Sequence, residues 1–369
     1  MEKVKISSFQ FFSLLVLFEL GTAIVVPLGI SSKQDSWLAI LLGLVGGIAL
    51  FMLYGLLFRM HPDSALLDYA KIIFGKWIGT LLGLLYIIFF IYGAARDLRD
   101  GGEFLQTAMY DQTPLFALNA LMIVTITYVL YSGIEVFART GEIFFMIMIG
   151  LGVIGVLLIL FSNIMDTTNL QPVFGSGWDS ILHAAYPQMF MFPFGETICF
   201  TMIFPYVNKL AAGIKTGTAA IVFSGVILCL ISLVEVSVLG VSIVARTTFP
   251  LLTTVSKVNI ANFLQRLDMI VVLALIIGDF FKVALFFIAA ALGTARLFRL
   301  PKYQDALLPI AIVILLCSMF IASNFPQHLA QGKFVLYNVI LFFSLIIPLL
   351  LLAVALIRAF ATRKAQSRS

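Results

Sequence analysis

The segment AAYPQMFMFPFGETICFTMIFPY, residues 184–206, decides the fold because it is apolar enough to cross a membrane but carries helix breakers at its centre. A transmembrane helix needs about 20 predominantly apolar residues. Pro187, Pro193 and Gly195 lie inside this run, and Pro205 lies near its end. Proline removes a backbone donor and disturbs the helix before it. We therefore predict a membrane span that is broken near its middle.

A matching break is predicted in the first apolar run, residues 9–31, which contains Gly21, Pro27 and Gly29. Gly21 and Gly195 are 174 residues apart, which corresponds to one unit of five spans. With an odd number of spans per unit, a second copy enters the membrane from the opposite side. This arrangement is typical of secondary transporters, whose broken helices form a site at the bilayer midplane. The alternative at this point is two kinked helices that face lipid.

The composition independently indicates a polytopic, all-α membrane protein. Of 369 residues, 62% are hydrophobic and only 11% are charged, whereas soluble domains carry roughly 25% charged residues. The apolar runs are continuous, which excludes the alternating strands of an outer-membrane barrel. The net charge of +5 falls in short loops and tails, so it indicates membrane orientation and no nucleic-acid partner.

We predict a single transmembrane domain, residues 1–369, with ten transmembrane helices in the lipid bilayer. The predicted spans are 9–31, 37–59, 77–106, 115–132, 142–162, 184–206, 217–244, 267–297, 305–323 and 335–358. Repeat one covers about 9–162, repeat two about 184–358, and a cytoplasmic tail 359–369. The remaining predictions are a short amphipathic helix at 64–75 and two long outer connections, 163–183 and 247–266.

Lysine and arginine positions predict that both termini face the cytoplasm, because cytoplasmic loops carry an excess of these residues. With the N-terminus inside, the inner side holds 15 of them: Lys3, Lys5, Arg59, Lys71, Lys76, Arg139, Lys209, Lys215, Arg296, Arg299, Lys302, Arg358, Arg363, Lys364 and Arg368. The outer side holds five: Lys33, Arg246, Lys257, Arg266 and Lys333.

The two breaks are the candidate ligand site. Backbone groups freed by a break must line a cavity or meet a ligand. A half-helix N-terminus suits the carboxylate of an amino acid, and freed carbonyls suit its ammonium. The residues assigned to this role are Gly21, Thr22 and Ala23 in span one, and Pro193, Phe194 and Gly195 in span six.

An acid lies beside each break: Glu19 two residues before Gly21, and Glu196 directly after Gly195. An ionisable group at membrane depth is a functional hypothesis by default. Either acid can hold a ligand ammonium or carry a proton. The structural alternative is a protonated acid that is hydrogen bonded to nearby backbone.

Spans three and eight add further charges. In span three, Tyr92 and Arg96 lie nearer the middle and are candidates to face the site. Local pairs such as Arg96–Asp100 and Arg99–Glu103 are expected from their spacing, and we interpret Arg99, Asp100 and Glu103 as a structural network.

Asp279 and Lys282 lie three residues apart near the centre of span eight. They can pair on one helix face as an internal salt bridge. Alternatively, Asp279 contributes to the ligand site, and the lysine ammonium replaces a bound sodium ion as a fixed or protonatable cation. No metal-ligand cluster, cofactor motif or nucleophile–base constellation is visible, so we expect neither an enzyme nor a bound metal or cofactor.

Several landmarks in order along nearly the whole chain resemble the spore germinant-receptor B subunits, also called endospore-type amino-acid permeases, of the amino acid–polyamine–organocation superfamily. The landmarks are Leu20-Gly21-Thr22-Ala23 up to Pro27, Arg99 with Glu103 and Thr113-Pro114, Gly133-Ile134-Glu135 with Ala138-Arg139, Asn169-Leu170-Gln171-Pro172, and Pro193-Phe194-Gly195-Glu196. In this family a second glycine is expected where Ala23 stands.

The resemblance implies a LeuT-like fold of two inverted five-helix repeats, with the site between spans one, three, six and eight. It implies a nutrient-binding receptor subunit in the spore inner membrane that senses an amino acid or a similar nutrient and triggers germination. It also implies receptor A and C subunits as partners. The alternative is a proton-coupled amino-acid permease, and a pore on the same scaffold is a third reading.

Overall fold

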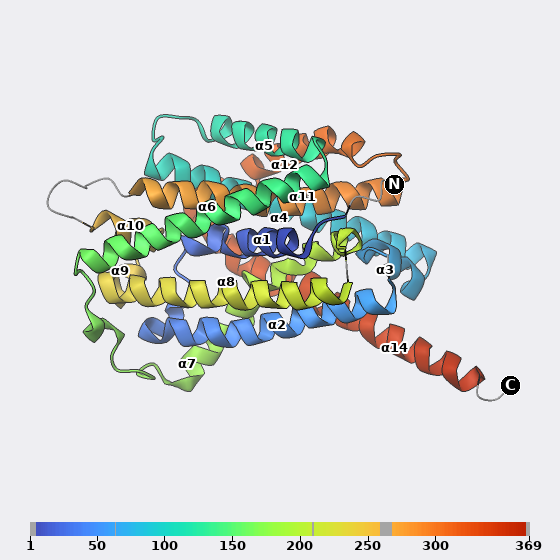
Figure 1. The fold of residues 1–369 in the computed structure, drawn as a ribbon, viewed down its shortest axis with the longest axis horizontal. Coiled ribbons are helices and arrows are strands. Elements are labelled where there is room, and N and C mark those ends of the chain that lie inside the picture. The colour runs from blue at the N-terminus through green and yellow to red at the C-terminus, as the bar shows by residue number, and fades with distance from the viewer. Residues whose placement is uncertain (1–4, 63, 209, 259–267, 367–369) are drawn as a thin grey trace.

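The protein is a bundle of helices that run mostly along one axis (Figure 1). The computed structural model describes residues 5–62, 64–208, 210–258 and 268–366. Three sequence-based predictions reach outside these ranges: the first residue of the span 267–297, residues 259–266 of the outer connection 247–266, and residues 367–369 of the tail. Lys3, Lys209, Arg266 and Arg368, which entered the orientation count, also lie outside them.

The helices of the described chain follow in this order, with η marking 3-10 and π-helical turns: α1 Ser8–Leu20, η1 Thr22–Ile24, η2 Ile30–Asp35, α2 Ser36–Met60, α3 Leu66–Phe74, α4 Lys76–Ala108, α5 Leu115–Tyr131, α6 Ile134–Phe161, η3 Thr167–Leu170, α7 Gly177–His183, η4 Ala184–Met189, η5 Phe194–Met202, η6 Phe204–Tyr206, α8 Leu210–Leu239, α9 Val241–Val244, α10 Pro250–Ser256, α11 Asp268–Phe298, α12 Gln304–Phe320, α13 Phe325–Val335, η7 Leu336–Ile340, η8 Phe342–Ile346 and α14 Ile347–Gln366.

Six described helices are long and apolar enough to cross a membrane: Ile30–Met60, Lys76–Ala108, Ile134–Phe161, Ala212–Leu239, Asp268–Phe298 and Phe325–Phe360. Three shorter apolar helices accompany them: Ser8–Leu20, Leu115–Tyr131 and Gln304–Phe320. The amphipathic helix expected at 64–75 is confirmed as α3. The protein is therefore an integral membrane protein built from helices.

The break predicted in the first apolar run is present. Helix α1 begins with a capping box between Ser7 and Gln10 and ends at Leu20, and the chain continues into the short turn η1. A Cβ atom on Gly21 would come within 2.8 Å of the Lys282 Cδ atom and 2.9 Å of the Phe18 carbonyl oxygen. The close approach of α11 at this point therefore requires glycine.

The second predicted break is more extensive than a kink. After α7 the chain forms the π turn η4, which contains Pro187, and then the tight 3-10 segments η5 and η6. All of η5 is buried, including Glu196. Residues 184–206 thus pass through the interior as irregular helical turns instead of one straight α-helix.

Helix α11 lies at the centre of the bundle and packs along α4. Every residue from Phe281 to Gly293 in α11 is buried. Helices α2 and α8 lie side by side along the bundle (Figure 1). The segment before α1 joins the end of the broken segment, where the Ile6 amide donates to the Tyr206 carbonyl and the Asn208 amide donates to the Ile6 carbonyl.

The C-terminal half of α4 is attached to α12 by Arg99, whose side chain is only 4% exposed. Its Nη1 atom donates to the carbonyls of Ser318, Met319 and Ala322 at 2.8–3.2 Å, and its Nη2 atom pairs with Glu103 at 2.9 Å. Carbonyls at a helix C-terminus have no partner within the helix. The predicted Arg99–Glu103 pair is thus confirmed and belongs to a clamp on the end of α12.

Replacing Arg99 with alanine is expected to lower the free energy of unfolding by about 3 kcal/mol, because it leaves a partly buried carboxylate and several carbonyls without their donor. The matched control is Arg139→Ala, which breaks an exposed i,i+4 pair with Glu135 and should cost under about 1 kcal/mol. Thermal unfolding in detergent compares the two. Equal losses for both variants would contradict the clamp.

Candidate ligand-binding site

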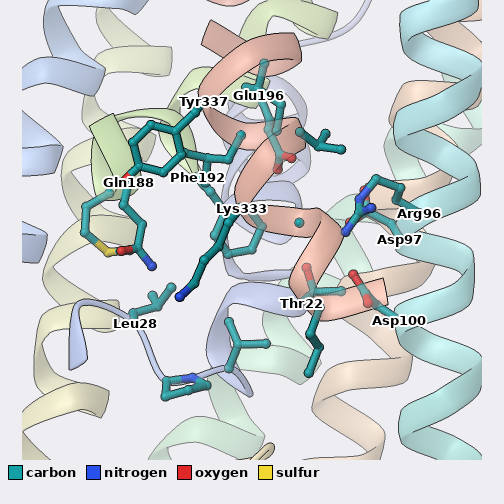
Figure 2. A pocket seen from close by; sticks show the side chains of 18 of the residues that line it. Thr22, Leu28, Arg96, Asp97, Asp100, Gln188, Phe192, Glu196, Lys333 and Tyr337 are labelled. Atoms are coloured by element: carbon teal, nitrogen blue, oxygen red, sulfur yellow. The ribbon is translucent and has the colours of Figure 1, made fainter. Parts of the chain in front are cut away.

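A cavity of about 880 Å³ lies where the two helix breaks face α4 and the α13–η7 segment. Thr22 reaches it from η1, Glu196 from η5, and Arg96 and Asp97 from α4. Figure 2 shows these side chains around the cavity, with Lys333 extending into it from α13. The volume is within the range of about 300–1,000 Å³ that small-molecule pockets occupy.

Beneath this cavity, the ammonium of Lys282 joins three elements. Its Nζ atom lies 2.7 Å from Glu196 Oε2 on η5 and 3.5 Å from Asp97 Oδ1 on α4. It also donates to the Thr22 hydroxyl on η1 at 3.2 Å. The lysine side chain is fully buried, and Thr22 and Glu196 are only 2% and 7% exposed. A buried charge of this kind is stable only when it is paired and hydrogen bonded.

Aromatic rings and the break at Gly21 complete the surroundings of Lys282. The Nζ atom lies 4.3 Å from the centroid of the Phe192 ring and 5.7 Å from that of Phe18, distances at which a ring face attracts a cation. The aliphatic stem passes against Gly21. The first break therefore makes room for this lysine as well as opening towards the cavity.

The α4 wall carries polar atoms that have no partner among the described residues. They are Nη1 of Arg96 and Oδ2 of Asp97, both buried. The Nη2 atom of Arg96 donates to the carbonyl of His328 at 3.3 Å, and the His328 ring Nε2 lies 2.8 Å from Asp100 Oδ1. The expected Arg96–Asp100 pair is replaced by these contacts with α13. One donor and one acceptor on cavity-lining residues are thus without a partner in the described chain, and protein covers both atoms.

The structure brings together four of the residues selected from the sequence. Thr22, Tyr92, Arg96 and Glu196 line the cavity. Others lie behind its wall and are not among the lining residues: Gly21, Ala23, Pro193, Phe194, Gly195 and Asp279. Glu19 is fully buried and interacts electrostatically with Lys282 and Glu196, but neither of its oxygens is hydrogen bonded to a described residue.

Asp279 is also fully buried, and neither of its carboxylate oxygens has a hydrogen-bond partner in the described chain. The internal salt bridge considered for Asp279 and Lys282 is not formed. Lys282 turns instead to acids on η5 and α4. The spacing within one helix therefore gave the wrong partner.

Sequence reasoning missed Asp97, Gln188, Phe192, Lys333 and Tyr337 as lining residues. Two of them carried a usable signal: Asp97 is an acid at membrane depth next to Arg96, and Phe192 lies directly before the second break. Lys333 was counted as a charge of an outer loop. It belongs to α13, which continues into η7 and brings Tyr337 to the same cavity.

The sequence is similar to spore germination proteins over most of its length. A family profile described as "Spore germination protein" matches residues 5–326. The chain is 41% identical over 356 residues to Spore germination protein KB of Bacillus subtilis (strain 168), which covers 96% of this chain and 95% of that protein. It is 25% identical over 313 residues to Spore germination protein YndE of the same organism, covering 81% of this chain and 84% of that protein.

Among solved structures, the fold is similar to that of Mhp1, a nucleobase-cation-symport-1 family transporter that was solved in a closed conformation with bromovinylhydantoin bound. The TM-score is 0.68 and the sequence identity 13%, over 87% of this chain and 73% of Mhp1. At this identity the likeness concerns the fold alone.

The fold and the cavity define the class: an integral membrane protein with a transporter-like helical fold. The extent of the sequence match then defines the family. The chain belongs to the spore germination proteins, the germinant-receptor B-subunit family that its sequence landmarks resemble.

Replacing Lys282 with methionine keeps most of the side-chain volume but leaves two buried acids without a cation. We expect the free energy of unfolding to fall by about 3–5 kcal/mol. The triple variant Lys282→Met, Glu196→Gln, Asp97→Asn removes all the charges and should recover most of this loss. Thermal unfolding in detergent measures both. If the triple variant is no more stable than Lys282→Met, the loss of stability in the single variant does not come from the two unpaired acids.

Proposed function

We propose that the protein is the nutrient-binding B subunit of a spore germinant receptor, in which a transporter-like fold senses a small molecule and triggers germination. The observation that carries this proposal is the cavity that meets both helix breaks, through Thr22 and Glu196. In the proposed role the protein binds and signals without catalysing a reaction.

An amino acid is the ligand class that we propose for this cavity. The unpartnered Arg96 Nη1 suits a carboxylate, and the unpartnered Asp97 Oδ2 suits an ammonium. Protein covers both atoms in this structure, but their residues are neighbours on α4 and both line the cavity, so a zwitterionic ligand contacts both atoms once these side chains turn towards it. Glu196 is already paired with Lys282. The proposed ligand therefore makes its main polar contacts with α4, and the two breaks give the cavity its shape.

The proposed membrane arrangement has ten spans in two inverted repeats of five. The six long helices support this proposal, in which the three short apolar helices and the interrupted segment 184–206 are the other four spans. We propose that both termini face the cytoplasm, as the distribution of lysine and arginine favours. The proposed location is the spore inner membrane, with receptor A and C subunits as partners.

A proton-coupled amino-acid permease is the second candidate, and two observations favour it. The fold neighbour is a transporter by name, and Glu19 is a fully buried acid beside the first break whose carboxylate oxygens have no hydrogen-bond partner in the described chain. A sensor and a transporter need the same pocket, because each converts different affinities for two states into a conformational change. Uptake therefore separates them better than binding does.

Binding and uptake of labelled amino acids should be measured on the same purified protein, first in detergent and then in proteoliposomes. The receptor proposal predicts saturable binding of at least one amino acid without accumulation inside the vesicles. Accumulation driven by a pH gradient would move the assignment to the permease. Absence of binding by every amino acid tested, with folded protein, would contradict the proposed ligand class.

Replacing Arg96 with glutamine is expected to weaken binding of that amino acid about 10-fold or more, because a hydrogen bond to a charged group contributes about 1.5–3 kcal/mol. Arg139→Gln, on the exposed surface of α6, is the control and should leave the affinity unchanged. Equal affinity in the Arg96 variant and the parent would remove α4 from the site. A conservative Arg96→Lys variant tests whether charge alone restores binding.

A further inference from the structure

A second hollow, of about 430 Å³, lies between α2 and α8 and away from the ligand cavity. The residues that line it are Met52, Gly55, Leu56, Arg59, Ile214, Lys215 and Thr218. The two helices run side by side in Figure 1. The hollow therefore has one wall from each half of the chain.

Its walls are apolar and open to the outside of the bundle. Met52 and Leu56 are 52% and 43% exposed on α2, while Ile214 on α8 is buried. A Cβ atom on Gly55 would lie 2.9 Å from Ile214 Cδ1, so the small residue lets α8 come close and forms the floor of the groove. Both helices are long and apolar enough to cross a membrane, so the groove faces the region that lipid occupies.

Two cations line this groove, near the C-terminal end of α2 and the N-terminal end of α8. Arg59 is the last residue but one of α2, and Lys215 lies in the second turn of α8. Both are exposed, and neither forms an ion pair or hydrogen bond with any residue in the described part of the chain. Helix ends of membrane spans lie at the level of the lipid headgroups.

Lysine and arginine are common at the cytoplasmic ends of membrane helices, so Arg59 and Lys215 alone would not indicate a binding site. A hollow with apolar walls between the same two helices is an additional feature. Basic pockets between membrane helices bind anionic lipid headgroups. The positive end and the apolar wall match the phosphate and the acyl chains of one molecule.

We infer that the groove between α2 and α8 is a binding site for an anionic phospholipid. The lipid phosphate lies between the Arg59 guanidinium and the Lys215 ammonium, and an acyl chain lies along Met52, Leu56 and Ile214. The bound lipid contacts both helices at once and joins α2 to α8 at this end of the bundle. The inference does not depend on which nutrient occupies the cavity.

The test is native mass spectrometry of the purified full-length protein in mild detergent, titrated with dioleoylphosphatidylglycerol or with dioleoylphosphatidylcholine. The parent should retain the anionic lipid in preference to the zwitterionic one. The Arg59→Gln, Lys215→Gln variant should bind phosphatidylglycerol about 30-fold more weakly, since each interfacial cation contributes about 1 kcal/mol. Binding of phosphatidylcholine should not change.

The matched control is Lys76→Gln, Lys302→Gln, which removes the same charge from exposed positions outside the groove and should retain the anionic lipid like the parent. An equal loss in both double variants would show a general effect of net charge and overturn the inference. Equal retention by the groove variant and the parent would overturn it as well. Displacement of the lipid by millimolar glycerol phosphate would show that the groove takes a free anion rather than a lipid.

Discussion

A lysine ammonium buried inside a membrane protein must have its counter-charges fixed around it, and in this protein that requirement arranges the centre of the fold. Lys282 draws Glu196 from η5, Asp97 from α4 and the Thr22 hydroxyl from η1 to a single point. Each of these groups lies on a different element. The two breaks and the two central helices are therefore held together by one charge cluster, and the cavity lies directly against it.

The breaks consequently have two roles. They free backbone groups from the regular helix, as broken membrane helices do where they line a cavity. They also let side chains come closer than a continuous helix would allow. Gly21 illustrates the second role, because the stem of Lys282 occupies the place of its missing side chain. On the opposite wall, α4 is regular and is attached to α12 and α13 by Arg99, Arg96 and Asp100. The cavity thus lies between a regular wall and an irregular one.

Much of this organisation was predictable from the sequence, because it depends on local properties. The positions of the apolar helices follow from hydropathy, both breaks follow from glycine and proline, and the Arg99–Glu103 pair follows from its spacing on one helix. The partners of Lys282 were not predictable in this way. Glu196 and Asp97 are far from it in the sequence, so only the packing of η5 and α4 against α11 determines the contact. Likewise, Arg96 and Asp100 have the spacing of a local pair but interact with His328, because α13 presents a carbonyl and an imidazole to them.

The central position of Asp279 and Lys282 in α11 has a consequence for how the protein is made. Each charged residue at the centre of a helix opposes its transfer from the translocon into lipid by about 2.5–3.5 kcal/mol. The chain is synthesised from the N-terminus, so α4 and η5, which carry the partners of Lys282, emerge before α11. The counter-charges of Lys282 therefore precede the nascent α11 into the membrane, and the insertion of α11 is coupled to its assembly with helices that are already there.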